Sequence, residues 1–303
     1  MNEANKLKTL SDVMAEAMGK LKGSGIHDPS LDAQWLTQHA LGLDRARMLS
    51  EARRVLTPEE RQRIDELMAR RAAREPVARI LGEREFWGLP FGLNEATLEP
   101  RPDSETLVEV VGRLIRILRT NNVASAGETI TAPRLLDLGT GTGCLLLALL
   151  HEWPEATGLG IDVARRAVEQ AQANAERLGL ASRAEFRIGD WLEGVAETFD
   201  VIVSNPPYIA AADIPCLMPE VRAHDPLAAL DGGADGLVVY RHLIPQLPQF
   251  LKPQGFVVLE VGQGQADAVA DLCLAAGLEG IEKHRDLGGV ERCVSSRMAL
   301  NRT

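Results

Sequence analysis

Long uninterrupted apolar stretches are missing from this sequence of 303 residues. A helix that spans a bilayer needs about 18 or more apolar residues, and no segment approaches that length. The opening residues, MNEANKLKTL, also lack the apolar core of a signal peptide. We therefore expect a cytoplasmic protein that makes no contact with a membrane.

Closely paired cysteines are missing as well. Cys144, Cys216, Cys273 and Cys293 are far apart, and none belongs to a CxxC pair. Structural zinc sites and dithiol redox sites use such pairs. We predict four free thiols in a reducing compartment and no metal.

Positive charge is in short supply, with 33 Lys and Arg against 43 Asp and Glu, a net charge of −10 and a pI of about 5.2. Nonspecific binding to nucleic acid requires clustered basic side chains that replace phosphate counterions. We therefore expect no direct nucleic-acid partner, and an acidic protein would instead suit a basic protein partner. We also predict a monomer.

The length and the 45% hydrophobic content allow one large domain and a smaller one. Internal repeats and long low-complexity segments are not evident. We predict a helical substrate-docking domain over 1–75, a β-hairpin linker over 76–100 and a catalytic domain over 101–303.

Helical periodicity is clearest in two segments of the first domain, Leu31 to Leu41 and Pro58 to Arg71. Thr57 before Pro58 is typical of an N-cap followed by proline at the first helical position. The stretch EREFWGLPFGLNEATLEP, Glu83 to Pro100, predicts two short strands around a turn.

Beyond residue 100 the pattern predicts a helix from Ser104 to about Arg119 and a mobile polar insert over 120–132, outside the site. From Arg134 onward, apolar runs alternate with helical patterns, as in a doubly wound parallel α/β sheet. Seven strands are expected, namely Arg134 to Leu138, Gly158 to Ile161, Ala184 to Ile188, Val201 to Ser204, Phe256 to Glu260, and two near 280–284 and 292–296.

A glycine-rich turn, DLGTGTG, follows the first of these strands and opens a helix. Glycines allow a sharp turn and the close approach of a ligand, although GxGxG lacks the third glycine of the dinucleotide pattern and is a weak signal by itself. Asp162, at the end of the second strand, is placed to accept hydrogen bonds from ribose hydroxyls. The candidate cofactor residues of the turn are Gly139, Thr140, Gly141, Thr142 and Gly143.

Three further residues are candidates for the same site. Asp137 either caps the glycine loop or meets a methionine ammonium, and the sequence does not separate these two roles. Asp190 and Trp191 follow the third strand, where they would contact an adenine amino group and cover its ring. A surface turn with a partly buried tryptophan is the structural alternative.

The most specific motif is Asn205-Pro206-Pro207-Tyr208, directly after an apolar strand. Open α/β sheets bind ligands at such strand ends. An amide nitrogen is a poor nucleophile, so a site that methylates one would need two fixed hydrogen-bond acceptors and a ring to hold the planar amide. We predict that the acceptors are the Asn205 side-chain oxygen and the Pro206 carbonyl, and that the ring is Tyr208. The structural alternative is a proline-stiffened connection with an Asx turn.

At these residues the sequence resembles the class I methyltransferases that modify planar amino groups, and more closely the HemK/PrmC family, which methylates glutamine in release factors. The resemblance covers most of the chain, through EREFWGLPF, EPRPDSETLVE, DLGTGTG, GDW, SNPPYI, EVRAHDPLAALDGGADGL and DLGGVERCV. It implies a Rossmann-like seven-stranded sheet with an N-terminal helical domain, S-adenosyl-L-methionine as cofactor, and the GGQ loop of release factors as substrate.

By the same resemblance, Asn205 would contact both the cofactor and the substrate glutamine, which residues 205–208 would hold. A sister family, which methylates a large-subunit ribosomal protein, tends to carry serine at the position of Asp103, so RPDSE favours the release-factor branch. DNA adenine methylation is a further alternative, since adenine methyltransferases share the (D/N)PPY arrangement but must also flip a base and grip phosphates. A binding module without activity is the alternative from a different class.

Overall fold

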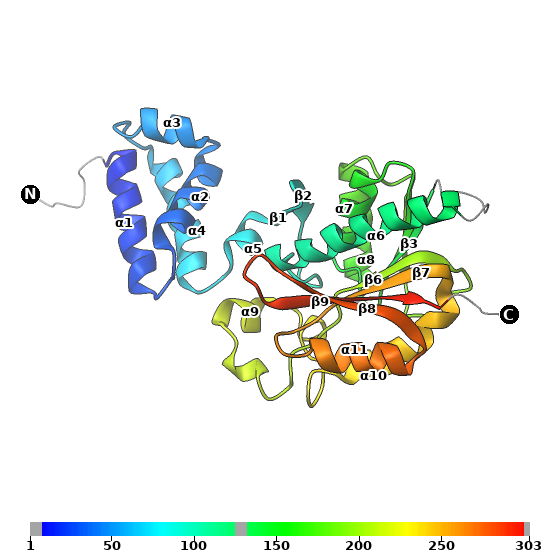
Figure 1. The fold of residues 1–303 in the computed structure, drawn as a ribbon. Coiled ribbons are helices and arrows are strands. Elements are labelled where there is room, and N and C mark those ends of the chain that lie inside the picture. The colour runs from blue at the N-terminus through cyan, green and yellow to red at the C-terminus, as the bar shows by residue number, and fades with distance from the viewer. Residues whose placement is uncertain (1–7, 125–131, 300–303) are drawn as a thin grey trace, which may run out of the picture. The chain divides into compact units, whose positions relative to one another are not determined.

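The computed structural model describes residues 8–124 and 132–299, which form two compact units that are considered separately below (Figure 1). The first unit contains the described residues up to Gly82 together with Met218–His224. The second contains Glu83–Leu217 and the residues from Asp225 onward. The expected segments 1–75, 76–100 and 101–303 divide the chain differently, since 76–82 cluster with the helical unit and 83–100 with the larger one.

The first unit is a small bundle of helices. Both predicted helices are present, and Thr57 is the predicted N-cap, because its hydroxyl accepts from the Glu60 N–H at 3.2 Å. The Thr57 N–H donates to the Glu60 carboxylate at 3.0 Å, which completes a capping box. Leu10, Leu36 and Ile64 lie in its fully buried core. The helices are α1 (Leu10–Gly23), α2 (Pro29–Leu41), α3 (Arg45–Ser50), α4 (Pro58–Ala72), α5 (Val77–Leu81) and α9 (Pro219–His224).

The second unit begins with the predicted hairpin, β1 (Glu83–Phe86) and β2 (Leu89–Gly92), which pair antiparallel. Phe86 and Phe91 pack edge to face in the core of this unit. A 3₁₀ turn, η2 (Pro102–Ser104), leads into α6 (Glu105–Ala124), which is longer than the helix predicted to end near Arg119. The rest of the predicted polar insert includes 125–131, which lie outside the described residues.

A seven-stranded sheet forms the centre of the second unit, and all seven predicted strands occur in it. The strand order is β5-β4-β3-β6-β7-β9-β8. The first five strands in this order are parallel, but β9 runs antiparallel to both β7 and β8, so the sheet is mixed rather than wholly parallel. The strands are β3 (Arg134–Leu138), β4 (Thr157–Asp162), β5 (Ala184–Ile188), β6 (Phe199–Ser204), β7 (Leu251–Glu260), β8 (Leu278–Arg285) and β9 (Glu291–Met298).

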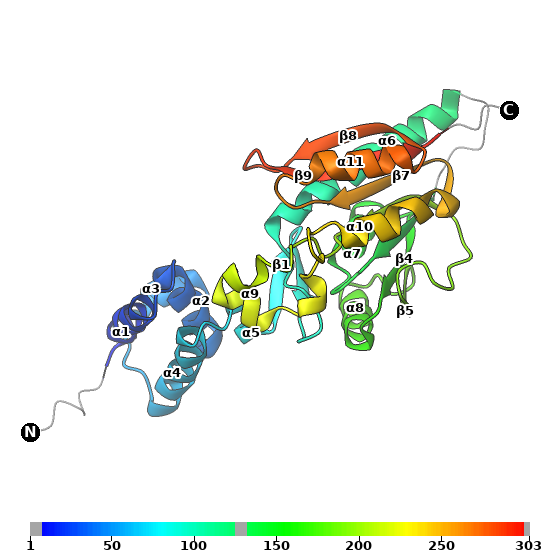
Figure 2. The ribbon, with the colours of Figure 1, turned by 90° about the horizontal axis from the view of Figure 1, so that it is seen from below.

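Helices cover both faces of this sheet (Figures 1 and 2). One apolar core lies under α6, α7 and α8, and a second lies under α10, α11 and the 3₁₀ segment η5. Burial of both faces explains why β3 (RLLDL) and β6 (FDVIVS) are mostly apolar. The helices are α7 (Cys144–Glu152), α8 (Arg165–Arg177), α10 (Val238–Leu243), η5 (Ile244–Phe250) and α11 (Ala266–Ala275).

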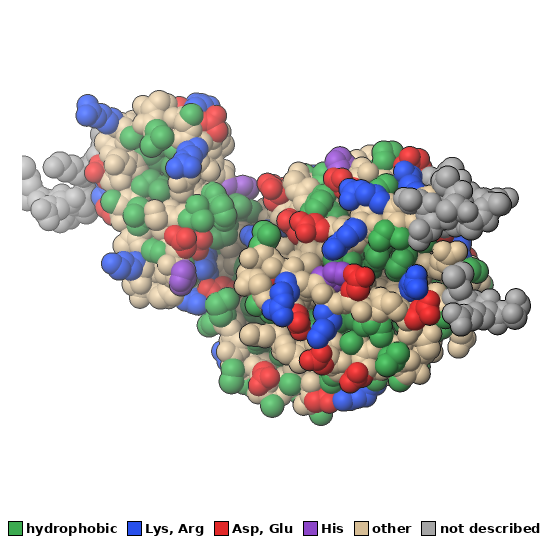
Figure 3. Space-filling model, viewed as in Figure 1, with side chains coloured by type: hydrophobic (Ala, Val, Ile, Leu, Met, Phe, Trp, Pro, Cys, Tyr) green, Lys and Arg blue, Asp and Glu red, His purple; other side chains and the backbone are tan. Residues whose placement is uncertain are grey.

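Within the described residues, no helix combines the length and the apolar character needed to cross a membrane. Basic and acidic side chains are interspersed on the face of the molecule shown in Figure 3. All four cysteines are free.

Candidate active site

A cavity of about 430 Å³ opens at the carboxyl ends of β3, β4, β5 and β6. It brings together the glycine loop after β3, Asp162 at the end of β4, the 189–191 turn after β5 and the loop that begins at Asn205 after β6. Three of its walls come from residues that the sequence analysis did not select. These are Ala96–Arg101 with Ser104, the segment Pro226–Asp231, and Val239.

The glycine loop is held in its conformation by Asp162. Gly139, Gly141 and Gly143 all have positive φ, at 72°, 55° and 78°, which favours glycine. The Asp162 carboxylate accepts from the Gly141 and Ala164 N–H groups, both at 2.9 Å. Burial raises the pKa of this carboxyl, while those two backbone hydrogen bonds act against the rise.

Asp137 lies beneath the loop and is only 1% exposed. Its Oδ2 accepts from the Thr140 hydroxyl at 2.7 Å, so it caps the loop, but its Oδ1 has no hydrogen-bond partner among the described residues. Burial raises the pKa of Asp137 to about 7, against the effect of the Thr140 hydrogen bond. A buried, half-satisfied carboxylate of this kind is suited to a cationic ligand group.

Trp191 and Asp190 line the same cavity. The indole of Trp191 lies over Gly139, where a Cβ would meet it at 3.6 Å, and Trp191 itself adopts an unusual φ of 52°. Asp190 is exposed, whereas Trp191 is partly buried. The turn therefore presents an aromatic face and a carboxylate to one ligand space.

The Asn205-Pro206-Pro207-Tyr208 loop borders the cavity through Asn205 and Pro207. The Asn205 Nδ2 donates to the Ser104 hydroxyl at 3.2 Å, and the Tyr208 hydroxyl donates to Glu260 Oε1 at 3.3 Å. Burial raises the pKa of Glu260 to about 7, while a hydrogen bond from Ser104, the charge of Arg292 and the hydrogen bond from Tyr208 oppose the rise.

Glycines of the LDGGADGL segment surround the same loop. A Cβ on Gly232 would meet the Tyr208 Cα at 2.8 Å, and one on Gly236 would collide with the Tyr208 carbonyl oxygen. Gln265, from the turn before α11, donates to that carbonyl at 2.9 Å. This segment was expected only from the family resemblance, although the adjacent glycines Gly232 and Gly233 are a signal for close backbone packing.

Both parts of the chain match known protein families. Residues 12–82 match the model of the PrmC N-terminal domain, and residues 132–277 match a methyltransferase domain. The chain is 50% identical over 281 residues to a release factor glutamine methyltransferase of Rhodospirillum rubrum, covering 92% of this chain and 82% of that protein. The corresponding protein of Bradyrhizobium diazoefficiens is 48% identical over 92% of this chain and 91% of its own length.

The chain belongs to the release factor glutamine methyltransferase family. Solved structures confirm the methyltransferase fold. A methyltransferase from Pyrococcus furiosus aligns with a TM-score of 0.50 at 17% identity, over 78% of this chain and all of its own. The catalytic domain of hMettl16 aligns with a TM-score of 0.56 at 18% identity, over 78% of this chain and 84% of its own.

Members of this family are S-adenosylmethionine-dependent methyltransferases, and the cavity suits that cofactor. The partnerless Oδ1 of Asp137 is available to an ammonium group, and the loop glycines leave the backbone open to close approach. Asp162 and the face of Trp191 provide a carboxylate for a ribose and an apolar surface for a purine.

Proposed function

We propose that this enzyme methylates the side-chain amide nitrogen of the glutamine in the GGQ motif of peptide-chain release factors, and so supports translation termination. The family to which the chain belongs supports the substrate. The observation that supports this chemistry is the hydrogen bonding of the Asn205 side chain at the cavity wall. Its Nδ2 is engaged by Ser104, which leaves its Oδ1 as an acceptor for a substrate N–H.

The loop residues would act by positioning the substrate. Asn205 Oδ1 and the Pro206 carbonyl would accept from the two amide N–H bonds, so that the nitrogen lone pair is turned away from its carbonyl and toward the methyl group. Pro207 and Tyr208 would pack against the planar amide. Positioning of this kind supplies roughly 7–11 kcal/mol in favourable intramolecular cases.

S-adenosylmethionine supplies a methyl group on a positively charged sulfur. It would transfer that methyl group to the nitrogen while the carbon–sulfur electron pair returns to the sulfur, and the nitrogen would release one proton to solvent. The cofactor would be held by Asp137, Gly139 to Gly143 with Thr140 and Thr142, Asp162, Asp190, Trp191 and Asn205.

The helical unit is the proposed docking surface for the rest of the release factor. Leu31 and Trp35, one turn apart on α2, are large apolar side chains that stay 38% and 40% exposed. We expect Trp35→Asp to raise KM for an intact release factor at least tenfold, and to leave KM for a short GGQ peptide unchanged. Leu274→Asp, on the 64% exposed Leu274 of α11, is the matched control. An equal effect on peptide and intact protein would reject docking at this surface.

The substrate is tested directly with labelled S-adenosylmethionine and a release factor, or its GGQ-loop Gln→Ala variant, followed by mass spectrometry of the methylated site. Transfer to that glutamine alone supports the proposal. Transfer to the large-subunit ribosomal protein or to DNA in parallel reactions would support the alternatives, and no transfer to any of them would favour a binding module. Sedimentation of the purified protein tests the proposed monomer, and fractionation of cells tests the proposed cytoplasmic location.

A further inference from the structure

A chain of hydrogen bonds lies behind the substrate-facing loop. Asn205 Nδ2 donates to Ser104 Oγ at 3.2 Å, and the Ser104 hydroxyl in turn lowers the pKa of Glu260, as a donor directed at that carboxylate does. Ser104 is 3% exposed and Glu260 is 1% exposed, so water contributes little to either group. Ser104 ends η2, Asn205 directly follows β6, and Glu260 ends β7, so the three residues are far apart in sequence.

These hydrogen bonds determine whether the oxygen or the nitrogen of the Asn205 amide is free to bind the substrate. An ionised carboxylate only accepts, so while Glu260 is ionised the Ser104 hydroxyl directs its single proton toward Glu260 and keeps its lone pairs for an incoming donor. The Asn205 NH₂ group is that donor. If the amide were rotated by half a turn, its oxygen would face a hydroxyl with no proton left to donate, and a buried hydrogen bond would be lost.

Glu260 also fixes Tyr208, the second loop residue proposed to hold the substrate. Its Oε1 accepts from the Tyr208 hydroxyl at 3.3 Å. The backbone of Glu260 is itself anchored, because its carbonyl accepts from the buried Tyr240 hydroxyl at 2.6 Å. One buried carboxylate is therefore linked to Tyr208 directly and to Asn205 through a hydroxyl.

We propose that Ser104 and Glu260 are positioning residues that hold the Asn205 amide with its oxygen available to the substrate and hold Tyr208 through its hydroxyl. Neither residue needs to touch the reacting atoms for this role. The inference rests on the proposed part of Asn205 in amide methylation, but the orientation of the Asn205 amide can be observed without any substrate.

The test compares two variants of equal size at one position. Ser104→Thr keeps the hydroxyl, whereas Ser104→Val replaces it with a methyl group of nearly the same volume. We expect Ser104→Thr to retain kcat within about fivefold and Ser104→Val to lose about 10- to 100-fold, the range that a misplaced reacting group produces. The KM for S-adenosylmethionine should change by less than about threefold in both, since the effect is on positioning rather than cofactor binding.

A matched pair at Glu260 follows the same logic. Glu260→Gln keeps a side-chain oxygen that accepts, and Glu260→Met fills the space without one, so only the second should lose turnover comparably to Ser104→Val. Ser296→Ala is the control, because Ser296 is a buried residue of the same sheet whose hydroxyl has no hydrogen-bond partner among the described residues. Its kcat should stay within about twofold of the wild type, because removing a hydroxyl that makes no such hydrogen bond disturbs little.

NMR of the Asn205 side-chain amide provides the readout that needs no substrate. Its two N–H signals should show slowed exchange in the wild type and in Ser104→Thr, and lose that protection in Ser104→Val. Equal kcat values for the Thr and Val variants, or equal protection in both, would overturn the inference. A wild type that methylates no release factor, with protection lost only in Ser104→Val, would instead reject the proposed substrate and leave the positioning role supported.

Discussion

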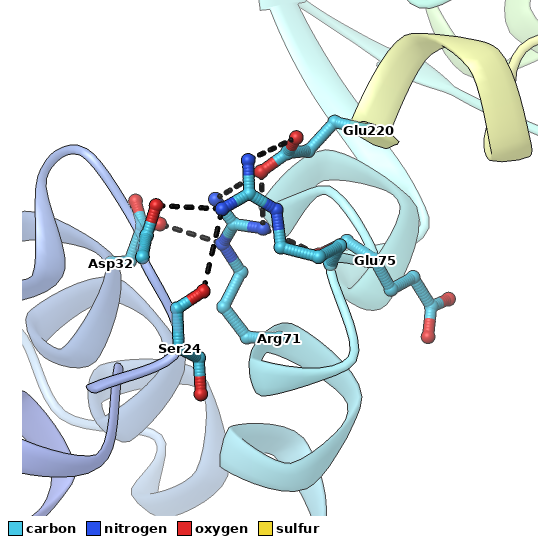
Figure 4. A network of polar contacts seen from close by, with 7 residues as sticks. Ser24, Asp32, Arg71, Glu75 and Glu220 are labelled. Carbon is cyan, nitrogen blue, oxygen red and sulfur yellow. Dashed lines mark hydrogen bonds and ion pairs between the residues drawn. The ribbon is translucent and has the colours of Figure 1, made fainter. Parts of the chain in front are cut away.

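Glu220 holds α9 within the helical unit, and its removal should loosen that helix. Its Oε1 accepts from both terminal nitrogens of Arg71 at 3.1 Å, and its Oε2 accepts from Arg74 at 2.8 Å. Figure 4 shows Arg71 reaching both Glu220 and Asp32, the latter at 2.7 Å. The Arg71 and Glu220 side chains are only 9% and 14% exposed.

The size of the effect follows from what remains after Glu220→Ala. Breaking a buried pair so that one charge is left alone costs about 3–5 kcal/mol. Arg71 would keep Asp32, and Arg74 would keep the Gly25 carbonyl at 2.6 Å, so neither charge becomes isolated. We therefore expect a loss of about 2–3 kcal/mol in the local stability of α9, near the value of one or two hydrogen bonds between charged groups.

Amide hydrogen exchange measures this local stability in the full chain. A loss of 2–3 kcal/mol corresponds to roughly 30- to 140-fold faster exchange in α9. Asp65→Ala is the control, because it removes an ion pair of Arg61 on α4 in which Asp65 is 52% exposed, and it should speed exchange less than about threefold.

Cofactor affinity should change less than about threefold in Glu220→Ala. The chain re-enters the second unit at Asp225, which accepts from Arg101 at 2.6 Å. That ion pair holds the cavity segment beginning at Pro226 independently of α9, and an ion pair to charged partners contributes about 1.5–3 kcal/mol. Unchanged exchange in α9, or the same acceleration in Asp65→Ala, would refute the reasoning.

Four further outcomes are expected. Asn205→Ala should keep S-adenosylmethionine affinity within a few-fold by calorimetry but lose most turnover, and an equal loss of both would contradict its role on the substrate. Asp162→Ala should weaken cofactor binding by about 1.5–3 kcal/mol through lost hydrogen bonds, and unchanged affinity would rule this out. Burial raises the pKa of Asp137 to about 7, and a nearby ammonium favours its ionised form. Cofactor binding should therefore release protons below pH 7 and tighten as pH rises toward 7. Calorimetry in buffers of different ionisation enthalpy detects this proton release, and Asp137→Asn should abolish it. Gly236→Ala should lower turnover and stability more than Gly264→Ala, since both have positive φ but only the first Cβ collides with Tyr208; equal effects would show that strain alone is responsible.

Apolar runs and the residues directly after them were predictable from sequence. Strand β3 has the predicted bounds, because a parallel strand buried on both faces is mostly apolar. Strand β5 also has the predicted bounds, although it lies at the edge of the sheet and is partly exposed. The glycine loop, Asp162 and Asn205 line one cavity for the same reason, since the carboxyl ends of parallel strands share an edge.

Features that depend on long-range pairing were not predictable in this way. The direction of β9 is set by its partners, β7 and β8, and not by its own pattern. The helix α9 clusters with the helical unit through Arg71 and Glu220, which are 149 residues apart and have no local signal in common. Ser104 and Glu260 likewise appear as an ordinary helix start and strand end until the fold brings them together.

The loop from Asn205 to Tyr208 shows why a short motif needs distant support. Two prolines restrict its backbone, but they do not orient the Asn205 amide or the Tyr208 ring. Those orientations come from Ser104 and Glu260, and the Tyr208 backbone is enclosed by Gly232, Gly236 and Gln265. Replacing these supporting residues with side chains that cannot make the same hydrogen bonds should therefore lower turnover, even when the four loop residues are unchanged.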